Sequence, residues 1–296
     1  MKKISLIFLI ILSKAVVFAQ EDIRVKIKDK EFYDTKAIAY VVEIPQAKFK
    51  DAQRAWPKYL KSSPKEKVIE DNGQFMIINK HIPKISTDSI DINSFIKEYS
   101  GQVVLTVSFK LNGKFISDDS KDEIHYPTAE YVREFAVEQY KKAVKNELNE
   151  EEKKFNKLDA DFKTLVREID NDRDAIKQKK REIIKLKDQI TLNEMDQSSK
   201  VIQIQAQKEL VYKLVNSPGD EQKDAEKKLK EVEKDFKQLQ NKKESLHNKI
   251  DNLEAQIRDK ERAISKNESK QKQIKLEKGD QEYIVEKVKK KLAGIE

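Results

Sequence analysis

The sequence predicts an α+β protein in which a small antiparallel-sheet domain with one or two covering helices precedes a long antiparallel coiled-coil hairpin. Three observations indicate this fold. Aromatic residues, Pro and Gly gather before residue 127, residues 128–217 contain neither Gly nor Pro, and apolar residues recur there every seven positions. We therefore expect a signal peptide at 1–19, an α+β domain at 20–126 and a helical hairpin at 127–296, with its tip near 216–220.

The composition of the 296-residue chain excludes one globular domain and several kinds of chemistry. Charged residues make up 39% of the chain and hydrophobic residues 38%, whereas a globular domain has about a quarter charged and about half apolar residues. The chain has no Cys. This excludes disulfides, thiol nucleophiles and thiolate metal sites, and it also excludes a lipoprotein, which needs a modified Cys.

The first residues have the three-part pattern of a cleavable secretory signal peptide. Two lysines precede the almost wholly apolar stretch 4–12, and Val17 and Ala19 supply the small residues at the −3 and −1 positions. We expect a cut after Ala19 and a periplasmic or secreted mature protein. The alternative is an uncleaved anchor, but the stretch is short and Lys14 interrupts it. No later segment approaches ~20 apolar residues, so we expect no transmembrane span after cleavage.

Strand and turn patterns predict the sheet of the first domain. Residues 36–44 form a strand pattern that Pro45 ends, and residues 47–60 have the apolar spacing of a helix. Asn72-Gly73 and Asn112-Gly113 each lie between strand-forming stretches. Such a pair predicts a hairpin, because a type I′ turn needs positive φ at both central residues. We expect the helix 47–60 and the start of the long helix to cover one face of the sheet.

Residues 103–111 alternate between apolar and polar side chains. We expect the apolar residues to form a buried face, and Thr106, Ser108 and Lys110 to form a face exposed to water. Residues 90–96 predict a further strand.

Two heptad patterns predict the hairpin. In the first helix one seam is apolar at every seventh position, whereas the seam three residues later is interrupted by polar residues. A breaker cluster at 216–220 precedes a second heptad pattern that begins at Ala225. Helices joined by so short a turn must run antiparallel, with paired residue numbers that add up to about 436, and the arm would be on the order of 100 Å long. The first seam consists of Leu148, Phe155, Phe162, Ile169, Ile176, Ile183 and Ile190.

Four polar seam residues fall at nearly the same level of this hairpin: Asp172, Lys179, Lys260 and Asn267. Asp172 and Lys260 are close enough to pair. A polar layer commonly fixes alignment at a cost in stability, and the alternative is a solvated weak spot where the hairpin bends. Residues 191–200 dilute the heptads, which predicts a kink there or, as the alternative, a break into three helices.

The residues just before the turn are more apolar than the seams require. We expect Ile202, Val211, Tyr212, Leu214 and Val215 to bind a partner, because exposed apolar patches can mark contact sites. The alternative interpretation is that a kink or a third helix buries them.

The sequence predicts no catalytic, cofactor-binding or metal site. His81, His125 and His247 fit no metal-ligand spacing, and the acidic cluster 118–123 lacks the pattern of a calcium loop. The net charge is +8, but acidic residues are interspersed throughout both helices, so we expect no nucleic-acid partner.

The leading hypothesis is a non-enzymatic scaffold or adaptor of a bacterial cell envelope, which uses the coiled coil to bind protein partners. The alternative is a periplasmic holdase for outer-membrane or secreted proteins. That architecture resembles the Skp-type chaperones by analogy, although here the β domain comes wholly before the arm. A third hypothesis is an enzyme with a pocket near Trp56, Tyr59, His81 or His125. The interrupted seam is compatible with a homo-oligomer.

Overall fold

The computed structural model describes residues 22–32, 35–215 and 220–295. The predicted signal peptide at 1–19 lies outside these residues, as does most of the predicted tip. The chain divides into two compact units: one is Met1–Phe155 with Gln281–Glu296, and the other is Asn156–Asp280.

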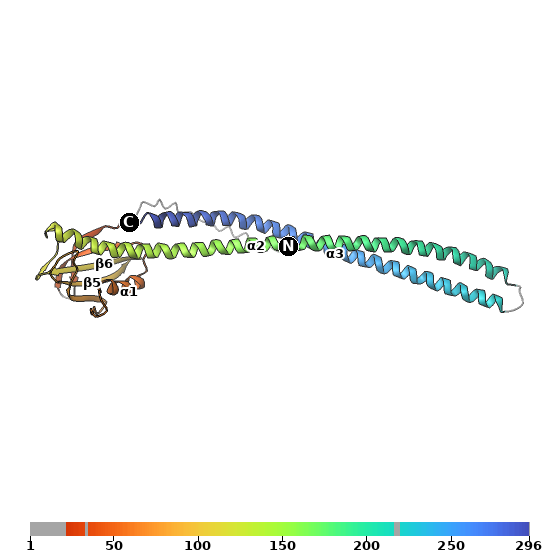
Figure 1. Cartoon of the computed structure of the whole chain (residues 1–296), viewed down its shortest axis with the longest axis horizontal. Coiled ribbons are helices and arrows are strands. Elements are labelled where there is room, and N and C mark those ends of the chain that lie inside the picture. The colour runs from red at the N-terminus through yellow and green to blue at the C-terminus, as the bar shows by residue number, and fades with distance from the viewer. Residues whose placement is uncertain (1–21, 33–34, 216–219, 296) are drawn as a thin grey trace. The chain divides into compact units, whose positions relative to one another are not determined.

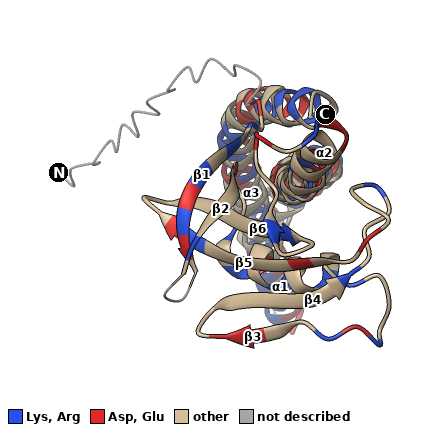
Figure 2. Ribbon diagram, turned by 90° about the vertical axis from the view of Figure 1, so that its left-hand side faces the viewer, with Lys and Arg blue, Asp and Glu red and all other residues tan. Residues whose placement is uncertain are grey.

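The first unit contains a seven-stranded antiparallel sheet with the order β1-β2-β6-β5-β4-β3, in which β7 pairs with β6 (Figure 2). This confirms the predicted α+β class. The strands are β1 Val25–Phe32, β2 Thr35–Ile44, β3 Ile69–Asp71, β4 Gln74–Lys80, β5 Ile90–Tyr99, β6 Gln102–Leu111 and β7 Lys114–Phe115.

Glycine turns join three of the strand pairs. Asn72-Gly73 and Asn112-Gly113 have the positive φ angles that the Asn-Gly signature requires, so both predicted hairpins are confirmed. A third hairpin joins β5 to β6 through Ser100 (φ 51°) and Gly101 (φ 81°). The sequence analysis missed it because Ser adopts positive φ less readily than Asn.

One face of the sheet is covered by α1 (Phe49–Tyr59) and the first turns of α2 (Asp122–Lys213), as predicted (Figure 1). Trp56 of α1 is fully buried, and its indole Nε1 donates a hydrogen bond of 2.7 Å to Ser94 Oγ on β5. Ser94 in turn donates to the Phe75 carbonyl at 3.2 Å. The indole therefore fills the core without leaving a polar atom unpaired.

The last turns of α3 (Glu221–Ala293) belong to the same core. Val288 and Ile295 are buried in the cluster that contains Trp56. Lys291 Nζ donates hydrogen bonds to Gln46 Oε1 at 2.6 Å and to Glu147 Oε2 at 2.9 Å. Residues from both ends of the chain thus build one hydrophobic core.

The opposite face of the sheet differs from the prediction. Thr106 and Ser108 are only 2% and 3% exposed, so the expectation that they face water is wrong. Phe95 on β5 is the register partner of Thr106 on β6. The ring centroid of Phe95 lies 5.3 Å from that of Phe32 on β1. Phe32 and Phe95 belong to a small apolar cluster with Ala37 and Ala39 of β2. Lys110 is exposed, as predicted.

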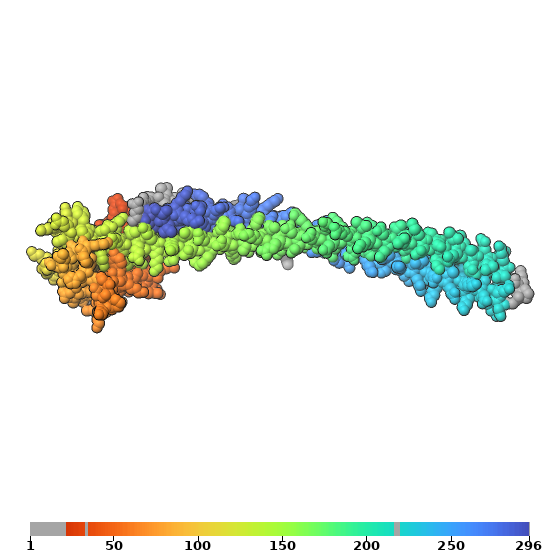
Figure 3. Space-filling model, in the orientation of Figure 1, coloured from red at the N-terminus to blue at the C-terminus, as the bar shows by residue number. Residues whose placement is uncertain are grey.

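The second unit, Asn156–Asp280, consists of the later part of α2 and most of α3, which pack along each other (Figure 3). Helix α2 has 92 residues and continues unbroken through 191–200, so the described residues of the hairpin form two long helices and not three. The buried seam of this unit consists of Ile176, Ile183, Leu186, Ile190, Leu246, Ile250, Leu253 and Ile257. Among the residues that the structure describes, no helix has a stretch that is long and apolar enough to cross a membrane.

Hydrogen bonds between the two helices confirm the predicted antiparallel alignment. Gln197 Nε2 donates to the Leu239 carbonyl at 3.3 Å, and Lys200 Nζ donates to Asp235 Oδ2 at 2.8 Å. The residue numbers in both pairs add up to about 436, as the short turn requires.

Candidate functional site

The predicted partner-binding residues lie in different environments near the end of α2. Tyr212 is 81% exposed and Val215 is 54% exposed, whereas Val211 and Leu214 are half-buried. No break in α2 buries them, because the helix reaches Lys213. We call Tyr212 and Val215 the tip patch. Its role in binding stays a prediction.

Ile202, the remaining predicted residue, belongs to a longer exposed surface that the sequence analysis missed. An α-helix turns by about 100° per residue. Ile202 therefore falls in one sector of α2, roughly 80° wide, together with four other large apolar side chains. We call these five residues the outer stripe. It consists of Ile184, Leu192, Met195, Ile202 and Leu210, whose exposed fractions range from 43% to 67%.

The outer stripe lies on the side of α2 that faces away from the seam. The buried seam residues Ile183, Leu186 and Ile190 fall roughly opposite to it by the same helical geometry. The gaps of the stripe are filled by Ser199, Ala206 and the charged Asp188, which are all exposed. Leu192, Met195, Ser199 and Ile202 repeat the alternating spacing of three and four residues, and this was the signal available in the sequence.

The polar seam layer forms as a set of bonds between the helices. Lys260 Nζ donates to Asp172 Oδ1 at 2.5 Å, which confirms the predicted pair. Lys179 instead donates to Gln256 Oε1 at 2.5 Å, and Asn267 donates to Glu168 Oε2 at 3.0 Å. All four predicted residues are half-buried, so the layer is a bonded part of the seam rather than an open gap.

A second polar position interrupts the seam nearer the end of α2. Asn193 is 3% exposed, and its Oδ1 accepts a hydrogen bond of 2.6 Å from Gln197 Nε2. Its amide nitrogen has no hydrogen-bond partner among the described residues. A buried amide with an unpaired donor costs stability.

The four residues of the enzyme hypothesis are not brought together around a histidine. Trp56 is buried and stacks on Tyr59, with ring centroids 5.8 Å apart. His125 lies 3.1 Å from the hydroxyl of Tyr40, measured from Nδ1. His81 is exposed in the loop after β4.

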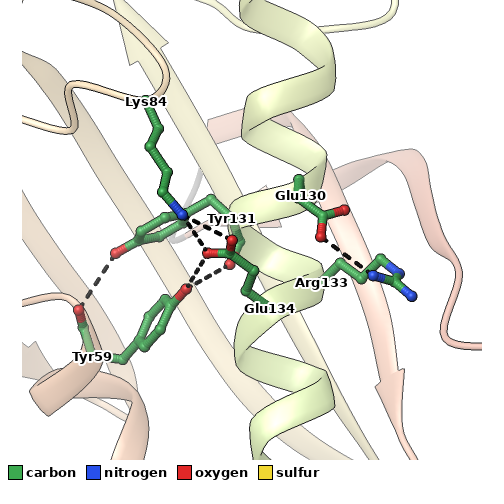
Figure 4. Close-up of polar contacts among 6 residues, drawn as sticks. All are labelled: Tyr59, Lys84, Glu130, Tyr131, Arg133 and Glu134. Carbon is green, nitrogen blue, oxygen red and sulfur yellow. Dashed lines mark hydrogen bonds and ion pairs between the residues drawn. The ribbon is translucent and has the colours of Figure 1, made fainter. Parts of the chain in front are cut away.

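Tyr59 takes part in a polar cluster between α1 and α2 (Figure 4). Its hydroxyl donates to the Tyr131 carbonyl at 3.1 Å and lies 3.5 Å from Glu134 Oε2. Lys84 Nζ donates to Glu134 Oε1 at 2.8 Å, and this carboxylate raises the pKa of Lys84. Burial raises the pKa of Tyr59 and of Tyr131 above the usual phenol range, so both remain protonated donors. The cluster therefore links α1 to α2.

The function of this chain has to be inferred from its own surfaces. No protein-family model and no curated protein matches the chain. Within the described ranges, which include all of the acidic cluster 118–123, no three His, Asp or Glu side chains converge as a metal site requires. The tip patch and the outer stripe are two exposed apolar surfaces near the end of α2.

Proposed function

We propose that the protein is an exported, non-enzymatic scaffold or adaptor of the bacterial cell envelope that contacts a protein partner through the tip patch. The observation that carries this proposal is the exposure of Tyr212, at 81%, beside the exposed Val215. Large aromatic side chains dominate the energy of many protein interfaces, because they bury a wide apolar area at a small entropic cost.

The packing of the helices supports the use of the hairpin as a binding arm. The apolar seam residues of the two helices pack against each other within one chain, in the buried cluster that contains Ile190 and Leu246. Polar bonds such as Lys260 to Asp172 hold the two helices in one alignment. Side chains at the end of α2 are therefore presented on a preorganised support, which reduces the entropy lost on binding.

The globular domain supports a non-enzymatic role. Its aromatic residues have roles in packing. The indole N–H of Trp56 donates its hydrogen bond to Ser94, and the hydroxyl of Tyr59 donates a hydrogen bond to the Tyr131 carbonyl of α2. Export is supported by the signal-peptide pattern at 1–19. Intact mass of the mature protein tests it, and we expect a chain that begins at Gln20.

Photo-crosslinking in cells tests the tip patch. A photoreactive residue at position 212 should capture one or two stoichiometric envelope proteins. The matched control is position 247, where His247 is exposed on α3 away from the tip patch. Specific capture at 212 alone supports the proposal. Capture of the protein itself and nothing else would contradict it.

The holdase alternative predicts a different pattern in the same experiment. A holdase should bind many unassembled outer-membrane proteins, and both positions should capture them. Purified mature protein should then also suppress the aggregation of a denatured outer-membrane protein. A Tyr212→Ser variant distinguishes the adaptor from the holdase. It should weaken the binding of one specific partner, whereas it should change the binding of many clients to a broad surface very little.

A further inference from the structure

We propose that the outer stripe is a self-association surface, through which α2 packs antiparallel against α2 of a second copy. This goes beyond the proposed function, because Tyr212 falls outside the sector of the outer stripe by helical geometry and Val215 follows the end of α2. The occupant is a second copy of this chain, and the argument rests on area, on register and on charge.

The area of the outer stripe suits a dimer. A free Ile, Leu or Met exposes about 200 Å², so the stripe leaves roughly 600 Å² of apolar surface uncovered on each copy. The fractions behind this figure range from 43% for Leu210 to 67% for Ile202. A stable interface buries ~800 Å² per partner, and the flanking Ser199, Ala206 and lysine methylenes would supply the remainder.

An antiparallel two-fold pairing aligns the outer stripe with itself. When paired residue numbers add up to 394, Ile184 of one copy meets Leu210 of the other, and Leu192 meets Ile202. The bulky Met195 then meets the small Ser199. Two-fold symmetry forms each contact twice, so a short stripe gives a long interface.

The charges beside the stripe favour this antiparallel alignment over a parallel one. The same register sets Lys185 opposite Glu209, both of which are exposed in one copy. A parallel pairing would instead set each charge against its own counterpart, Lys185 on Lys185 and Glu209 on Glu209, and like charges disfavour that arrangement. Arg181 and Lys213 would meet only at the ends of the interface, where solvent and salt screen them.

The exposed surface of α3 supports pairing through α2. The large exposed hydrophobics on the described part of α3 are Leu276, Tyr283 and Ile284, far in sequence from the residues that pack against the stripe region of α2. Among the described residues of the two helices, α2 therefore presents the longer row of exposed large apolar side chains.

Analytical ultracentrifugation of the mature full chain tests the proposal. We expect a dimer at micromolar concentration, and the double variant Leu192→Gln with Ile202→Gln should dissociate about 100-fold more readily. Both side chains are exposed in one copy, so circular dichroism should show an intact fold. Tyr212→Ser is the matched control and should leave the dimer unchanged. A wild-type chain that is monomeric at 100 µM or more (roughly the weak end of specific association) would overturn the proposal.

Charge exchange and cysteine trapping test the register. Lys185→Glu should weaken the dimer and Glu209→Lys should do the same, whereas the double exchange should restore it. The chain has no Cys, so single cysteines can be placed freely. A mixture of Met195→Cys and Ser199→Cys chains should form a disulfide-linked heterodimer, and neither variant alone should do so. Crosslinking of Ser199→Cys alone would indicate a parallel pairing and overturn the proposed one.

Discussion

Replacing Glu66 by alanine should destabilise the globular domain far more than replacing its ion-pair partner Lys80 by methionine. Lys80 lies at the end of β4, and its side chain is only 2% exposed. Its Nζ donates hydrogen bonds to Ser62 Oγ at 2.5 Å and to Glu66 Oε2 at 2.7 Å. The pair ties the segment after α1 to the sheet.

The expected asymmetry follows from the different burial of the two charges. Glu66→Ala leaves a buried ammonium group with one neutral partner, and breaking a buried pair in this way costs about 3–5 kcal/mol. Lys80→Met removes the buried charge and leaves Glu66, whose side chain is 31% exposed and can be hydrated. Its carboxylate also keeps the hydrogen bond of 2.6 Å from the Ser62 amide. This variant should lose only about 1 kcal/mol.

Urea unfolding followed by tryptophan fluorescence measures both values, because Trp56 is the single Trp and lies in the core of this domain. Lys84→Met is a suitable control. The lysine side chain of its ion pair with Glu134 is 69% exposed, so the loss of this pair should lower the free energy of unfolding far less than Glu66→Ala does. If Lys80→Met cost as much as Glu66→Ala, the burial argument would be refuted.

The pair also predicts a pH dependence. The hydrogen bond from Lys80 lowers the pKa of Glu66. A carboxyl group with a lowered folded-state pKa stabilises the fold above its unfolded pKa of about 4.3, and this contribution is lost as the pH falls through the folded value. The wild type should therefore lose more stability below about pH 4 than Lys80→Met does.

Three further perturbations probe other parts of the structure. Replacing Asp172 and Lys260 together by leucine should raise the free energy of unfolding of the hairpin by about 1–4 kcal/mol, whereas Lys260→Leu alone should not. Thermal circular dichroism at 222 nm compares the double and the single variant, and equal effects of both would contradict an ion-pair layer. Gly101→Ala should lower the free energy of unfolding by about 1 kcal/mol, because Gly101 has a φ of 81°. Urea unfolding measures this value, and an unchanged stability would show that the turn tolerates a side chain. In an ultraviolet titration Tyr59 and Tyr131 should ionise well above the usual phenol value of about 10, so Tyr→Phe variants at these positions should remove only late-titrating absorbance.

The parts of the fold that sequence patterns predicted depend on local geometry. The heptad residues from Leu148 to Ile190 repeat at the helical period, so one face of α2 had to be buried. The short turn then set the alignment that Gln197 and Leu239 confirm. Asn-Gly pairs predicted two hairpins because few other residues adopt positive φ at both positions.

The parts that were missed depend on contacts between distant segments. Thr106 and Ser108 look solvent-exposed in their own strand, but both are buried, and Thr106 lies opposite Phe95 of β5 in the sheet. Strand β1 escaped notice because Lys26, Lys28 and Lys30 occupy one of its sides, whereas Asp29 and Glu31 interrupt the apolar residues of the other.

The candidate site was predicted in part. Tyr212 stood out because it directly follows a seam position in a stretch that is more apolar than the seams require. The outer stripe did not, since its residues share the helix with a stronger apolar pattern. Only the exposure of each side chain separates the stripe from the seam.

The shared core of the first unit has a consequence for how the protein folds as it is made. A chain leaves the ribosome from its N-terminus, and domains usually fold as soon as their residues are available. Here the cluster around Trp56 also needs Val288 and Ile295, which lie at the end of α3 and are synthesised after the rest of the hairpin. The sheet therefore has to wait, with part of its apolar surface uncovered, until the entire hairpin has been built and its second helix returns.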